Sequence, residues 1–213
     1  MQIKELIDII NIYDIKVNFD NAEDVAEKIM KGTSPLYFTP VEGSEWKKYK
    51  KKKNNRDFTS TTATIHIIDL SIDDFVKIFE CDVTGIHEFT NNIINPYCNE
   101  KINRNIVYMI FLFLHEVGHW FQFKKMDRKV YDFMERNRAL YEENFKKKTL
   151  LEERRQGRID NGNQCILTAK EKKLFEQYMK EYRNIPKENE ADEFALSQME
   201  TSLKLYLNSC LSE

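Results

Sequence analysis

The spacing of apolar and polar residues predicts a chain built mainly from helices. Apolar side chains recur every three or four positions over residues 2–14, as on one face of an amphipathic helix. SIDDFVKIFE, residues 71–80, predicts a short helix capped by Ser71 with acids in its first turn. The longest apolar run, IVYMIFLFL, lies within a helix predicted over about 103–125. A last helix is predicted over about 186–208, because Pro186 is a residue type favoured at the first helical position.

Between these helices the pattern is weaker. TSTTATIHIIDL, residues 59–70, is rich in β-branched residues and predicts a strand. A short helix is expected within NFDNAEDVAEKIM, residues 18–30, with Asp20 or Asn21 as its cap. Residues 32–57 are punctuated by glycine and proline and are expected to form a loop, and 83–100 reads as a looser segment.

A charged insertion is predicted before the last helix. Residues 124–183 contain 17 Lys or Arg and 11 Asp or Glu, with a break at GRIDNGNQ. We expect an inserted helical hairpin with arms near 127–156 and 168–183. The chain is 213 residues long, which suits a single α+β domain over 1–213 that is mostly α.

Composition narrows the class of protein. The chain is 41% apolar and 32% charged, with a net charge of −2, so no overall polarity attracts nucleic acid or an anionic membrane. The lysine cluster at 47–53 is interpreted as a solvated loop, and nucleic acid is an unlikely partner. The four cysteines are widely scattered and no signal-peptide pattern is present. Because nine apolar residues cannot span a bilayer, we expect a cytoplasmic protein with free thiols and no membrane association.

The motif HEVGHW within the central apolar helix indicates a metal site. His115 and His119 are four residues apart, so both imidazoles lie on one face of a helix and can bind one zinc ion. Glu116 is rotated by one residue step, where it can contact a water on the metal and act as general base. Two unpaired buried histidines would each cost about 1–3 kcal/mol, which favours the metal site over a structural role.

Two histidines leave zinc one protein ligand short, and the last helix offers the best third ligand. His66, His87 and a carboxylate are the candidates. Glu188 and Glu190 lie about 200° apart around a helix, so only one of them can face the core. Glu188 shares its face with apolar residues, whereas Glu190, the alternative ligand, lies on a polar face. Asp192 follows Glu188 by one turn and can hydrogen-bond a ligand histidine from behind the metal.

The two motifs together resemble those of a known protein family. HEVGHW followed by PKENEADEFA is similar to the gluzincin zinc metallopeptidases, in particular to the ImmA/IrrE-type metallo-endopeptidases of bacteria and their mobile elements. The resemblance implies a zincin-like core, with a small sheet whose edge strand, 59–70, lies over the active-site helix and aligns an extended substrate. It also implies a third ligand in an E-x-x-x-D context, which corresponds to Glu188 and Asp192. The chain departs from compact members in its 124–183 insertion and lacks a recognisable DNA-binding helix-turn-helix.

The expected function is zinc-dependent hydrolysis of peptide bonds in a protein or peptide substrate, with Glu116 activating a metal-bound water. Tyr178, Tyr182 and His66 are candidate donors to the oxyanion. Gly118 either admits the edge strand or serves helix packing. The alternative function is a regulatory binding protein, such as an anti-repressor or adaptor, that keeps the zinc site without proteolysis. The sequence leaves the substrate and the oligomeric state open.

Overall fold

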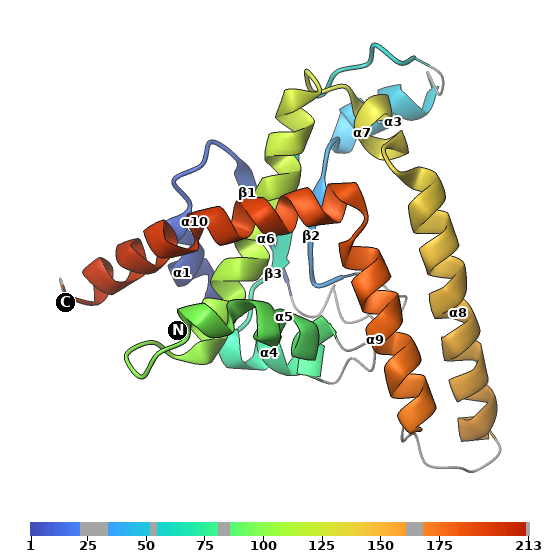
Figure 1. Ribbon diagram of the computed structural model, residues 1–213. Helices are drawn as coiled ribbons and strands as arrows, with labels where there is room; N and C mark the ends of the chain where they lie inside the picture. Colours follow the sequence, from blue (N-terminus) through green and yellow to red (C-terminus); the bar gives the residue numbers. More distant parts are fainter. Residues whose placement is uncertain (22–33, 52–54, 81–85, 161–167, 212–213) are drawn as a thin grey trace.

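The chain folds into a mostly helical structure with one small mixed sheet (Figure 1), which confirms the expected α+β class. The computed structural model describes residues 1–21, 34–51, 55–80, 86–160 and 168–211. The elements in chain order are α1 (Ile3–Ile10), β1 (Lys16–Asp20), β2 (Leu36–Thr39), α3 (Gly43–Lys51), β3 (Thr64–Ile68), α4 (Ile72–Glu80), α5 (Ile86–Ile94), the 3-10 turn η1 (Asn95–Tyr97), α6 (Arg104–Lys125), α7 (Val130–Glu135), α8 (Arg138–Asp160), α9 (Ala169–Arg183) and α10 (Pro186–Cys210).

Helix α6 is the centre of the core. It begins after Asn103, whose side chain accepts a hydrogen bond from the backbone N–H of Asn105, and most of its residues are buried on every side. Helix α10 crosses it and packs against it, while the sheet lies beside it (Figure 1). Helix α6 is long and apolar enough to span a membrane, but 89% of its most apolar window is buried inside the protein, as in a core helix.

The sheet has the strand order β1-β3-β2, with β1 parallel and β2 antiparallel to β3. Ile65 and Ile67 of β3 are fully buried. The strand predicted at 59–70 is present but shorter, and its predicted position at the edge is wrong, because β3 is the central strand. The edge strand that packs on α6 is β2, in a segment that was expected to be a loop.

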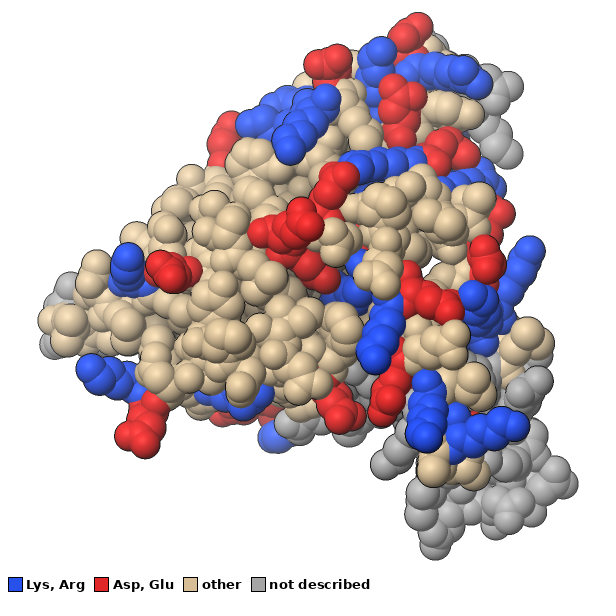
Figure 2. Space-filling view, in the orientation of Figure 1, with Lys and Arg blue, Asp and Glu red and all other residues tan. Residues whose placement is uncertain are grey.

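The inserted hairpin is present as two helices that lie side by side, α8 and α9, preceded by the short α7 (Figure 1). An ion pair of 2.7 Å between Lys147 and Glu181 joins α8 to α9. A capping box between Thr168 and Glu171 fixes the start of α9. On the face shown in Figure 2, basic and acidic side chains of this region are interspersed rather than separated by sign.

Several predicted boundaries differ from the structure. The loop predicted at 32–57 contains β2 and α3, and the looser segment at 83–100 contains α5 and η1. Helix α1 ends at Ile10 rather than near residue 14. The short helix expected after a cap at Asp20 or Asn21 lies outside the described residues. The helices at 71–80, 103–125 and 186–208 are confirmed as α4, α6 and α10.

Gly118 allows α6 and α10 to approach closely. A Cβ placed on Gly118 would lie 2.9 Å from Cα and 3.0 Å from the carbonyl oxygen of Ala191, on α10. These are backbone atoms, so an added methyl group would push the two helices apart. Of the two roles considered for Gly118, helix packing is therefore the one that the contacts support.

The variant Gly118→Ala is expected to destabilise the protein by about 1–2 kcal/mol. Overpacking a tight core costs about 1–3 kcal/mol, and the higher helix propensity of alanine offsets about 1 kcal/mol of that. Chemical denaturation of the variant beside the parent would measure the change. A variant more stable than the parent would show that α6 and α10 do not pack closely at Gly118.

Candidate metal centre

Two helices bring three donor side chains to one point. His115 and His119 lie one turn apart on α6, and Glu188 lies in the first turn of α10. All three are buried, and one ligand atom from each lies within 4.8 Å of the others. Nε2 of His115 is 3.2 Å from Oε2 of Glu188, and Nε2 of His119 is 3.5 Å from Oε1. We call these residues the metal triad.

The metal triad has the spacing that a small cation needs. Ligands about 2.0–2.1 Å from a tetrahedral zinc ion are separated from one another by about 3.3 Å. The two Nε2–carboxylate distances, 3.2 and 3.5 Å, lie on either side of that value. Two imidazoles and a carboxylate form a donor set that zinc commonly takes. The triad could therefore hold a metal ion.

The ring nitrogen of His115 that faces away from the triad is held by Asp192, as expected from the sequence. Nδ1 of His115 lies 2.8 Å from Oδ1 of Asp192. The buried Arg183 of α9 donates from Nη1 to the same oxygen, also at 2.8 Å. Nδ1 of His115 is thus turned towards Asp192, and Nε2 is the ring nitrogen that faces the triad.

His119 is oriented in a similar way by a neutral side chain. Its Nδ1 lies 3.1 Å from Oε1 of the buried Gln122, one turn further along α6. The amide nitrogen of Gln122 donates at 2.7 Å to the backbone carbonyl of Lys187, in the first turn of α10. This chain of hydrogen bonds joins the two helices that carry the triad, directly behind it.

Two tyrosines of the hairpin reach Glu188. The hydroxyl of Tyr141, on α8, donates to Oε1 of Glu188, and Tyr182, on α9, lines the same cavity. Burial raises the pKa of both phenols, and the negative charge of Glu188 raises it further. Both hydroxyls therefore stay protonated at neutral pH and remain hydrogen-bond donors.

Glu116 lies next to the triad but outside it. The backbone N–H of Phe38, on β2, donates to Oε2 of Glu116 at 2.8 Å. Burial raises the pKa of Glu116, which brings it closer to the value suited to a general base at neutral pH. Glu116, the triad and Tyr141 face a common cavity of about 310 Å³, which we call the triad cavity.

The charges around the triad favour a bound cation. Burial alone would raise the pKa of Glu188, but hydrogen bonds with His115 and His119 hold it well below its ordinary value. Burial alone would lower the pKa of His115, but its contacts with Asp192 and Glu188 raise it to about 9. Without a metal, these carboxylates therefore attract a proton, and a metal must displace it.

The other candidate residues lie elsewhere. Glu190 is exposed and forms an ion pair with Arg136, so Glu188 alone of the two glutamates reaches the triad. His87 packs against the ring of Tyr108, and His66 lies on the sheet. Of the three candidate oxyanion donors, Tyr182 lines the triad cavity, whereas Tyr178 and His66 do not.

Sequence reasoning missed three residues that contact the metal-binding side chains. Gln122 follows His119 by three positions on one helix, and that spacing could have identified it. Arg183 and Tyr141 come from the hairpin, and no local pattern indicates which of its many polar residues turn inward.

Comparison with known proteins identifies no relative. No family model, no curated protein and no solved structure matches the chain.

Proposed function

We propose that this protein is a zinc metallopeptidase of the gluzincin type, with a zincin-like core. The observation that carries the proposal is the convergence of the metal triad beside Glu116, in a cavity of about 310 Å³. Among the described residues, the triad supplies only three protein ligands. A structural zinc site usually has four, whereas a catalytic site leaves one position for water or substrate. This difference favours an enzyme over an adaptor that only contains zinc.

The proposed cofactor is Zn²⁺, held by His115, His119 and Glu188. When bound, zinc would lower the pKa of a coordinated water and polarise the substrate carbonyl. Glu116 takes a proton from the attacking water and delivers it to the leaving amine nitrogen, which returns the carboxylate to its starting state. The Phe38 N–H holds Glu116 in place for both transfers.

Strand β2 is the proposed guide for an extended peptide. Among the described strands it pairs only with β3, and its other side faces the triad cavity. On that outer side the Phe38 N–H donates to Glu116, and the hydroxyl of Ser34 bonds both the N–H and the carbonyl of Leu36, so a pairing substrate strand would replace the Ser34 contacts. A substrate strand beside β2 would bring its backbone next to the general base.

Zinc removal provides the test. With free zinc at about one hundred times its Kd, binding stabilises the folded state by about 2.7 kcal/mol. For a chain of this size, a chelator should then lower Tm by about 5–10 °C and abolish peptide hydrolysis, and added zinc should restore both. Calorimetry and a peptide digest measure the two effects.

The control for this experiment is His119→Ala, whose Tm should not respond to zinc or to the chelator. A parent protein whose Tm and hydrolysis are unchanged by the chelator would contradict the proposed zinc enzyme.

A further inference from the structure

A second cavity of about 280 Å³ adjoins the triad cavity across β2. Tyr37 of β2 lines both cavities. Two consecutive residues of α7 are divided between them, since Phe133 lines the triad cavity and Met134 lines the second one. We call the second cavity the β2 pocket. A group bound there would lie beside the reacting centre but on the other face of the sheet.

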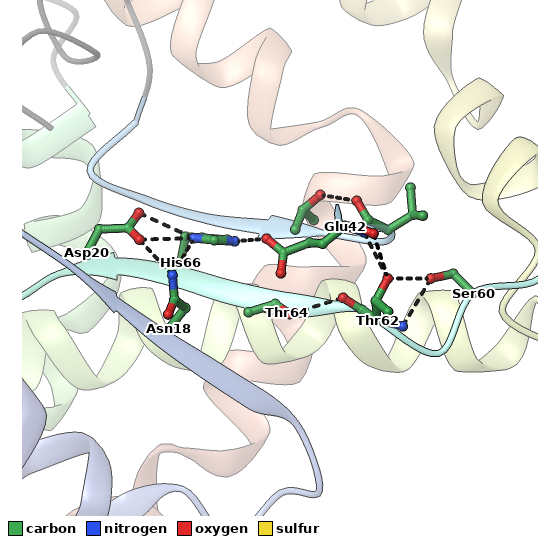
Figure 3. A network of polar contacts seen from close by, with 9 residues as sticks. Asn18, Asp20, Glu42, Ser60, Thr62, Thr64 and His66 are labelled. Carbon is green, nitrogen blue, oxygen red and sulfur yellow. Dashed lines mark hydrogen bonds and ion pairs between the residues drawn. The ribbon is translucent and has the colours of Figure 1, made fainter. Parts of the chain in front are cut away.

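The polar wall of the β2 pocket contains a histidine held between two carboxylates (Figure 3). Nδ1 of His66 lies 3.2 Å from Oδ2 of Asp20, and its Nε2 bonds Oε1 of Glu42. Asn18 donates to Asp20 at 2.8 Å. His66 and Glu42 line the pocket directly, with Asp20 behind them. This arrangement joins β1, β3 and the segment that follows β2.

This wall is negatively charged in either protonation state of the histidine. Two carboxylates with a protonated His66 have a net charge of −1, and with a neutral His66 a net charge of −2. Among the described residues, Oε2 of Glu42 accepts no hydrogen bond, and the side chain of Glu42 is 26% exposed. One carboxylate oxygen is therefore available to a cationic ligand.

The remaining wall of the β2 pocket is aromatic. The ring of Tyr37 stacks on His66 with centroids 4.9 Å apart and an interplanar angle of 8°. Trp46 of α3 also lines the pocket, and Nζ of Lys50 lies 4.8 Å from the centroid of its ring. The Trp46 ring therefore already contacts an ammonium group of this chain. Aromatic surface beside a carboxylate suits a side chain with an apolar stem and a cationic end.

The strand geometry connects the β2 pocket with a substrate in the triad cavity. Tyr37 pairs with His66 across the sheet, so its side chain lies on the face opposite to those of Leu36 and Phe38. An extended peptide beside β2 also alternates its side chains between the two faces. A residue one or two positions from the reacting bond would then place its side chain over the β2 pocket.

We propose that the β2 pocket is a specificity subsite for a lysine or arginine side chain of the substrate, one or two residues from the scissile bond. This inference rests on the proposed peptidase function. Glu42 pairs with the cationic end, and Tyr37 and Trp46 pack against the stem.

A randomised octapeptide library tests the subsite. After digestion with the zinc-loaded parent, mass spectrometry of the products should show lysine and arginine enriched at one position near the cleaved bond. Glu42→Gln should reduce that enrichment at least tenfold while cleavage continues. Met134→Lys should have a similar effect, because it adds a positive charge at an exposed rim position without disturbing the core. Glu200→Gln, an exposed change on α10, is the matched control and should keep the preference.

A binding experiment separates failure of the subsite from failure of the peptidase proposal. Immobilised Glu116→Gln protein is incubated with the same library, and the retained peptides are sequenced with and without the additional Glu42→Gln change. Cleavage by the parent without a basic preference would overturn the subsite and leave the peptidase proposal intact. Retention of basic peptides that depends on Glu42, with no cleavage by the parent, would support the pocket and overturn proteolysis. If the parent cleaves no peptide and the Glu116→Gln protein retains no basic peptides selectively, the subsite and the peptidase proposals are both overturned.

Discussion

Replacing Glu116 with glutamine is expected to abolish peptide hydrolysis while zinc remains bound at one ion per chain. The amide cannot take a proton from water, and loss of a general base typically costs a factor of about 10²–10⁴ in rate. Zinc should stay because Glu116 is not part of the metal triad. The amide oxygen can still accept the hydrogen bond from the Phe38 N–H, so β2 should keep its position.

Three measurements make this prediction decisive. Metal analysis reports the zinc content, thermal unfolding reports the fold, and digestion of a peptide library reports the rate. Glu200→Gln carries the same chemical change at an exposed position of α10 and should match the parent in all three. A Glu116→Gln protein that holds zinc and cleaves as fast as the parent would rule out Glu116 as the base.

The members of the metal triad could be predicted because helix periodicity determines which side chains share a face. The four-residue spacing of His115 and His119 places both rings on one face whatever surrounds the helix. The same periodicity selected Glu188 over Glu190, since the buried face of α10 carries Glu188, Asp192 and the apolar residues beyond them. In both α6 and α10, the side chains that the helical pattern selects are the ones that meet in the triad.

The sheet could not be predicted to the same extent. Strand β2 has only four residues, Leu36–Thr39, between Pro35 and Pro40, which is too short for an alternating pattern to emerge. Its structure depends on pairing with β3 and packing against α6, which are contacts distant in sequence. The stronger β composition of 59–70 correctly indicated a strand, but composition does not determine which strand occupies an edge.

The hairpin also has a larger part in the site than its sequence indicates. Its helices are highly charged, and α8 has almost no apolar face that would mark an inward side. Yet Tyr141 on α8 contacts Glu188, and Arg183 at the end of α9 contacts Asp192. The insertion between His119 and Glu188 therefore orders the metal triad from behind, in addition to separating its two helices along the chain.

Glu188→Gln is expected to lose zinc, whereas the same change two residues later at Glu190 is expected to keep it. A neutral amide is a poor zinc ligand, and its loss of charge leaves His115 and His119 as the only strong donors of the triad. The affinity for zinc should fall by more than the 10–100-fold that is typical when a partner behind the metal is removed. Glu190 is exposed, and its ion pair with Arg136 contributes less than about 1 kcal/mol.

Asp192→Asn is expected to have an intermediate affinity for zinc. It tests whether a variant loses less affinity when the changed residue lies further from the metal. The amide oxygen can still accept from Nδ1 of His115, but the charge that faces Arg183 is gone, so zinc affinity should fall by about 10–100-fold. Titration with zinc against a competing chelator gives the Kd of each variant. The expected order of affinity is parent and Glu190→Gln, then Asp192→Asn, then Glu188→Gln. If Glu188→Gln bound zinc as tightly as Glu190→Gln, the carboxylate of α10 would not be a ligand, and the proposed catalytic geometry would fail with it.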